Sequence, residues 1–123
     1  MDITGFNEPQ ARSLLDLIVL AMYMDGNLAS VEAARVQQLL TAMGFKSDYD
    51  RNREFDASVT RVRQHAEVPE AARAFAGKLA TLFTLPEHRQ RVYGMLNDLV
   101  ASDGQVSAEE NKFIAAVKEA LQM

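Results

Sequence analysis

The sequence predicts an all-α fold, a compact bundle of about six helices. In successive segments, apolar residues recur every three or four positions, which is the spacing of one helix face. No segment alternates cleanly between apolar and polar residues, as a half-buried strand would. Glycines and prolines stand between the segments, where they suit helix ends. A chain of 123 residues, 48% of them hydrophobic, can bury one core, so we expect one domain over residues 1–123.

The first predicted helix opens at Asn7 or Glu8, carries Pro9 in its first turn, and runs to about residue 25. Its segment over residues 14–24 is the most apolar in the chain. That segment has about half the length a membrane span needs, and it contains Asp16. We therefore expect a central core helix and no transmembrane segment.

A second helix is predicted over residues 30–43, with Gly44 as its terminator, and it forms an αα-hairpin with the first. Residues 45–50 are expected to form a loop. After this loop, the spacing of four apolar residues predicts a third helix with one buried stripe. These residues are Phe55, Val59, Val62 and Ala66.

Pro69 marks the start of a fourth predicted helix, and Pro86 separates it from a fifth that ends at the Asp-Gly of residues 103–104. The last helix is predicted over residues 107–121. Gly77 and Gly94 fall inside these helices, where glycine costs about 1 kcal/mol relative to alanine. Close helix–helix contact would compensate for that cost, as would a ligand that approaches the backbone.

Composition narrows the classes of partner. The net charge of −4 argues against nucleic acid or an anionic membrane, because both require a concentrated cationic surface. The chain has no cysteine, which excludes disulfides and thiolate metal sites and is compatible with a reducing compartment. Residues 1–8 lack the basic and apolar regions of a secretion signal, so we expect a cytoplasmic protein.

Two similar segments, residues 24–32 and 102–110, are the most informative feature of the chain. In each, an apolar stretch stops at Asp-Gly, an apolar residue follows two positions after the glycine, and a glutamate follows six positions after it. The pairs are Asp25 with Glu32 and Asp103 with Glu110. This repetition predicts a duplicated helix–loop–helix with two carboxylates at fixed spacing.

Both segments match the second half of a calcium-binding EF-hand loop, but the first half is missing because apolar or aromatic residues replace its ligands. An ordinary EF-hand site is therefore not expected. The two half-sites would combine if the hairpins packed about a pseudo-twofold axis and brought their carboxylates together. Such carboxylates repel one another unless a cation neutralises them. Oxygen ligands without histidine or thiolate favour calcium or magnesium.

The same residues also have a purely structural interpretation. Ser107 and Glu110 fit a capping box, Asp103 can accept hydrogen bonds from turn amides, and Gly104 suits a positive φ angle. Both interpretations stay open: the loops hold a metal ion, or they only cap helices.

The pattern Asp-Gly-x-(Leu or Val)-(Ala or Ser)-x-x-Glu, near both ends of an all-helical chain of this size, resembles the tellurite-resistance TerB-like domain family. The resemblance implies a fold built from two related helical hairpins and an acidic site for a divalent cation. Ala29 and Val31 depart from the family pattern in the first loop. The resemblance implies no known reaction. Carried onto this sequence, the implied metal ligands are Asp25, Glu32, Asp103, Glu109 and Glu110.

No catalytic or cofactor-binding residue is predicted, because the chain has no Gly-x-Ser-x-Gly, no phosphate-binding glycine-rich loop and no His-Glu-x-x-His. His65 and His88 stand alone in the sequence, and we expect solvated or capping side chains. Four arginines lie among acidic residues, and we interpret them as a solvated helix face rather than a nucleic-acid surface. They are Arg51, Arg53, Arg61 and Arg63.

Two functional hypotheses follow. The first is a non-enzymatic stress-response domain that binds a divalent cation through its acidic Asp-Gly loops. The second is a metal-free interaction domain that engages a protein partner through an apolar surface, with the loops serving only as caps. Neither the partner nor a homo-oligomeric state is determined by the sequence.

Overall fold

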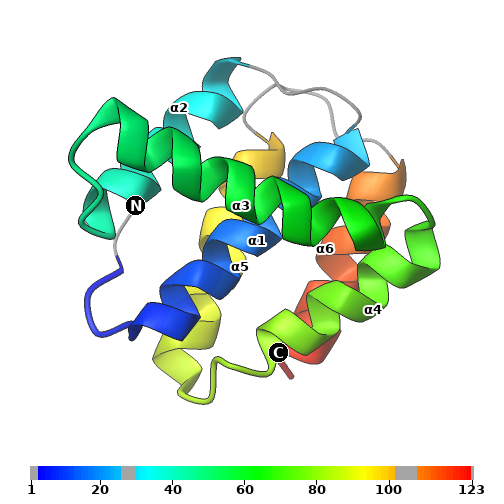
Figure 1. Cartoon of the computed structure of the whole chain (residues 1–123). Helices are drawn as coiled ribbons and strands as arrows, with labels where there is room; N and C mark the ends of the chain where they lie inside the picture. The colour runs from blue at the N-terminus through cyan, green and yellow to red at the C-terminus, as the bar shows by residue number, and fades with distance from the viewer. Residues whose placement is uncertain (1–2, 26–29, 102–107, 123) are drawn as a thin grey trace.

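The computed structural model of the protein describes residues 3–25, 30–101 and 108–122 (Figure 1). Within these ranges the chain forms six α-helices and no strand, so the predicted all-α class is confirmed. The helices are α1 (Glu8–Asp25), α2 (Ser30–Ala42), α3 (Asp48–Ala66), α4 (Pro69–Ala80), α5 (Pro86–Ala101) and α6 (Ala108–Ala120).

Helix α1 forms the centre of the bundle and contacts each of the other five helices. Figure 1 shows α3 crossing in front of α1 and α5 lying behind it. Every residue of α1 from Leu14 to Met22 is buried. A helix that is apolar on all sides needs protein around its whole circumference, and this arrangement supplies it. The prediction of a central core helix is confirmed.

The other helices each turn one apolar stripe toward α1. Helix α2 buries Val36, Leu39 and Leu40, and α5 and α6 each bury a similar set. The sets on α5 and α6 are Val92, Leu96, Leu99, Phe113, Ile114 and Val117. Burial of each such side chain stabilises the fold by about 1.5–3 kcal/mol relative to its exposure, and this contribution decides the packing. No helix in the described parts of the chain combines the length and apolar character that crossing a bilayer needs.

Helix α1 begins at a reciprocal cap. The backbone N–H of Gln10 donates to Asn7 Oδ1 at 2.9 Å, and the N–H of Asn7 donates to Gln10 Oε1 at 3.0 Å. Two backbone donors at the helix start are thereby satisfied. The Gln10 amide also donates to the carbonyl of Leu82 at 3.0 Å, which ties the start of α1 to the turn between α4 and α5.

The α2–α3 loop is shorter than predicted. We expected a loop over residues 45–50, but α3 begins at Asp48, because the hydroxyl of Ser47 accepts a hydrogen bond from the N–H of Asp50 at 3.1 Å and caps the helix there. At the other side of the loop, Gly44 ends α2 with a φ of 103°, a conformation that side chains disfavour.

The two helical glycines differ in their surroundings. A Cβ added to Gly77 would lie 3.7 Å from Ala120 Cβ, which is an ordinary van der Waals contact between α4 and α6 and leaves room for a methyl group. At Gly94, an added Cβ would meet no atom of the described residues within 4 Å outside the local helix. Close packing with the described residues therefore requires glycine at neither position.

Candidate functional site

The four helix ends that flank the two Asp-Gly segments lie in the same part of the molecule. In Figure 1, the C-terminal ends of α1 and α5 and the N-terminal ends of α2 and α6 all point to the upper part of the view. Helices α1, α5 and α6 contact one another, and α1 also contacts α2. The fold thus directs these four helix ends toward one end of the bundle.

The side chains of the predicted metal ligands fall outside what the structure describes. Asp25 closes α1, and Glu32, Glu109 and Glu110 lie on α2 and α6, but their side chains are not among the described ones. Asp103 lies outside the described residues altogether. Among the residues that are described, no group of three or more acidic or histidine side chains is placed to hold a metal ion. The carboxylate cluster stays a prediction.

Inside the bundle, Asp16 forms a buried polar cluster that links α1 to α3. Ser58 Oγ donates to Asp16 Oδ1 at 2.5 Å, and Arg61 Nη2 donates to the same oxygen at 2.9 Å. Arg61 Nε donates to Asp16 Oδ2 at 3.0 Å, which completes a bidentate pair. The hydrogen bond with Asp16 raises the pKa of Arg61. Since both carboxylate oxygens are engaged, the cluster acts as a structural clamp.

Sequence reasoning missed this clamp, although its signal was present. Asp16 is a single charge in the most apolar segment of the chain, and a buried charge requires a partner. Ser58 and Arg61 are three residues apart and therefore share one face of α3. The sequence contains several other arginines at helical spacing, and only the packing of α3 across α1 selects this one.

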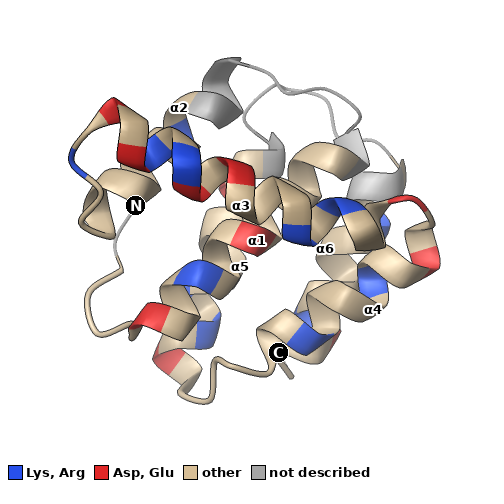
Figure 2. Ribbon diagram, viewed as in Figure 1, with Lys and Arg blue, Asp and Glu red and all other residues tan. Residues whose placement is uncertain are grey.

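The arginines of α3 divide into those that make internal hydrogen bonds and those that are exposed. Arg51 donates to the carbonyls of Phe45 and Lys46 at 3.3 and 2.7 Å and to Gln37 Oε1 at 2.9 Å, and it also pairs with Asp48. It thus holds the α2–α3 loop in place. Figure 2 shows acidic and basic residues interspersed along α3.

The predicted solvated face is therefore wrong for Arg51 and Arg61, whose side chains are 17% and 37% exposed and make internal hydrogen bonds. Arg53 and Arg63 are exposed, as expected. Because Arg51 and Arg61 are engaged in internal hydrogen bonds, fewer cationic side chains are available to bind a polyanionic partner.

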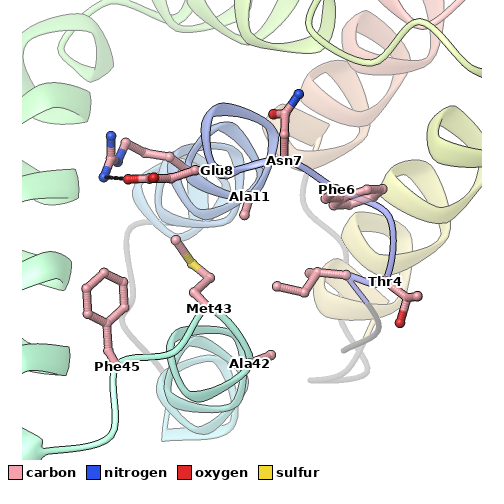
Figure 3. Close-up of a pocket in the computed structure, with 10 residues that line it drawn as sticks. Thr4, Phe6, Asn7, Glu8, Ala11, Ala42, Met43 and Phe45 are labelled. Atoms are coloured by element: carbon pink, nitrogen blue, oxygen red, sulfur yellow. Dashed lines mark hydrogen bonds and ion pairs between the residues drawn. The ribbon is translucent and has the colours of Figure 1, made fainter.

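An open cavity of about 580 Å³ lies between residues 3–7, the first turns of α1 and the C-terminal end of α2 (Figure 3). Its walls are mixed, with six apolar and four polar or charged residues, and one side carries the ion pair between Glu8 Oε1 and Arg12 Nη2 at 3.1 Å. The volume falls within the range of small-molecule sites. The apolar lining residues are Ile3, Phe6, Ala11, Ala42, Met43 and Phe45.

Residues 3–7 are held against the bundle by one aromatic anchor. The centroid of the Phe6 ring lies 5.3 Å from that of Phe83 and 4.8 Å from that of His88, and it meets the His88 ring edge-on. The guanidinium carbon of Arg91 lies 4.6 Å from the Phe6 centroid, and Arg91 Nη2 donates to the carbonyl of Thr4 at 2.6 Å. These contacts join the N-terminal segment to α5.

The expectation of solvated or capping histidines is wrong for His88. Its side chain is buried in this aromatic contact, and its Nδ1 makes no hydrogen bond to any described residue. Packing of Phe6 over α5 causes the burial, and nothing local to His88 in the sequence indicates it. His65 lies in the last turn of α3 and stacks on Phe75, with ring centroids 4.0 Å apart and planes at 8°.

A bundle of six helices, with the ends of α1, α2, α5 and α6 that flank the Asp-Gly segments at one end, is the class of fold that the described residues define. The model of the family described as Tellurite resistance protein TerB matches residues 11–123, which include both Asp-Gly segments. The chain belongs to the TerB family, as its loop pattern suggested. No curated protein and no solved structure matches the chain.

Proposed function

We propose that this TerB-family chain is a non-enzymatic stress-response domain that binds one divalent cation, calcium or magnesium, between its two Asp-Gly loops. The observation that carries the proposal is the position of the four helix ends that flank these loops, which point to one end of the bundle (Figure 1). Membership of the TerB family supports it. The absence of cysteine and the expected cytoplasmic location agree with such a role.

The proposed ligands are carboxylates from both hairpins: Asp25, Glu32, Asp103, Glu109 and Glu110. Carboxylates gathered in one place repel one another, and a hard cation with several oxygen ligands removes that repulsion. The ion would join the α1–α2 corner to the α5–α6 corner. Because an ion that binds only the folded state stabilises it, binding should raise the melting temperature.

Catalysis is not part of the proposal, since Asp16, His65 and His88 are engaged in structural contacts. Both oxygens of Asp16 accept hydrogen bonds from α3. His65 and His88 pack against the rings of Phe75 and Phe6. The hydroxyl that Asp16 contacts, that of Ser58, is fully buried, so no substrate can reach it.

The test is a melting experiment on chelator-treated protein with and without calcium or magnesium. Ion at about 100 times its dissociation constant should stabilise the chain by about 2.7 kcal/mol. The variant Asp25→Asn/Glu110→Gln, which removes one carboxylate from each loop, should lose this shift.

A matched control removes the same charge elsewhere: Asp56→Asn/Glu119→Gln changes two exposed carboxylates outside the loops and should keep the shift. A melting temperature that neither ion changes would contradict the proposal. An equal shift in both double variants would mean that the ion binds elsewhere.

The open cavity beside residues 3–7 favours a second candidate, a metal-free domain that engages a protein partner. In that case the loop glutamates only stabilise the helix starts. Glu32, Glu109 and Glu110 lie in or beside the first turns of α2 and α6, where a negative charge interacts favourably with the positive end of the helix dipole. Removal of these carboxylates would then lower stability by the same amount with and without the ion.

A further inference from the structure

We propose that Phe83, His88 and Arg91 form a docking site for a glycine–aromatic peptide segment of a partner protein, and that residues 3–7 of this chain occupy the site as a tethered ligand. We call these three residues the aromatic site. Phe83 lies in the turn before α5, and the other two lie on α5. The inference does not depend on a metal ion at the Asp-Gly loops.

The N-terminal segment contacts the aromatic site in the way that a short peptide contacts a receptor. One side chain, Phe6, supplies the anchor, with its ring centroid 4.6 Å from the guanidinium carbon of Arg91 and 5.3 Å from the Phe83 ring. One backbone carbonyl, that of Thr4, accepts a hydrogen bond from Arg91 Nη2 at 2.6 Å. An aromatic anchor combined with a backbone hydrogen bond gives affinity and register together.

The geometry at Gly5 adds a requirement for glycine before the aromatic residue. Gly5 has a φ of 86°, and a Cβ built on it would lie 3.4 Å from His88 Nε2. A side chain at this position would be strained by the backbone conformation and crowded against a buried ring. The aromatic site therefore selects glycine followed by an aromatic residue.

The segment and the site belong to different parts of the chain. The TerB family match covers residues 11–123, so the aromatic site lies inside it and residues 3–7 lie outside. On the side away from α5, the segment faces the open cavity of about 580 Å³ instead of closely packed side chains (Figure 3). Thr4 and Gly5 are exposed, so the segment lies at the surface where a competing peptide reaches it, while Ile3 and Phe6 pack against the core.

Because residues 3–7 belong to the same chain as the aromatic site, they compete with any added peptide for it. A tethered segment competes at an effective concentration of the order of millimolar, so a free peptide of similar chemistry binds the intact chain weakly. A partner segment displaces residues 3–7 only if it binds the aromatic site more tightly. A tryptophan in place of phenylalanine would do so through a stronger cation–π contact with Arg91.

The test uses the full chain with the tethered anchor removed, Phe6→Ala, and a labelled capped peptide of sequence Asp-Ile-Thr-Gly-Phe-Asn. We expect the peptide to bind Phe6→Ala at least about tenfold more tightly than the unaltered chain, measured by fluorescence anisotropy. Replacing Phe by Ala in the peptide should abolish binding. Adding Arg91→Ala to the Phe6→Ala chain should weaken it by about tenfold.

A second variant guards against a fold defect in Phe6→Ala. Gly5→Val keeps Phe6 but strains the docked backbone, and it should also expose the aromatic site to the peptide. Circular dichroism establishes that both variants stay helical. The proposal is overturned if neither variant binds the peptide, or if the Phe and Ala peptides bind equally well.

Discussion

Arg61 on α3 directs two guanidinium N–H groups at the two carboxylate oxygens of Asp16 on α1, at 2.9 and 3.0 Å. The carboxylate is buried, with 5% of its side chain exposed, whereas the Arg61 side chain is 37% exposed. The pair therefore spans the interface between the core helix and its largest neighbour. The contribution of the pair to the free energy of unfolding depends on the burial of Asp16 and on the hydration of Arg61.

Replacing Asp16 by alanine should lower the free energy of unfolding by about 2–3 kcal/mol. The loss leaves Arg61 without its partner, but the guanidinium can regain some water, so the cost stays below that of a fully buried pair. Urea unfolding followed by circular dichroism measures the change. Glu8→Gln, which breaks an exposed pair with Arg12, is the control and should leave the unfolding midpoint unchanged.

The cost of Asp16→Ala should be the same at about pH 7 and about pH 10. The hydrogen bond with Asp16 raises the pKa of Arg61 above its already high ordinary value. Stability from a raised pKa is fully present below the unfolded pKa and is lost only as pH rises through the folded one, here in strongly alkaline solution. A cost that falls by half between these two pH values would contradict this assignment.

Alanine should have opposite effects at two glycines. Gly94→Ala should stabilise the protein by about 1 kcal/mol, because a helical backbone accepts the new Cβ and no described atom opposes it. Gly44→Ala should destabilise it by about 1–2 kcal/mol, since φ is 103° at the end of α2. Thermal melts of the two variants test both signs, and a destabilised Gly94→Ala would reveal an unrecognised close contact.

The cap of α1 should be worth about 1 kcal/mol. In Asn7→Ala, the N–H of Gln10 loses its acceptor at the start of the central helix. Differential scanning calorimetry should show a lower melting temperature. Asn7→Asp retains an acceptor and should stay close to the unaltered chain; a loss as large as that of Asn7→Ala would argue against the capping role.

Helix periodicity predicted six helices and the central position of α1, because an apolar stretch such as residues 14–22 has only one stable environment. Local chemistry explains the error at α3, where Ser47 begins the helix earlier than the apolar stripe indicates. Contacts across long sequence separations were not predictable, among them the selection of Arg61 by Asp16 and the burial of His88 under Phe6. The paired Asp-Gly loops were visible because the sequence repeats them.

The most direct test of the proposed function is the number of ions that the chain binds in a calorimetric titration of chelator-treated protein with calcium. A site shared by the two loops predicts one ion per chain, and its loss in either Asp25→Asn/Glu32→Gln or Asp103→Asn/Glu110→Gln. Two ions per chain, with one surviving in each variant, would contradict a shared site. No binding heat, with calcium or with magnesium, would contradict the cation itself.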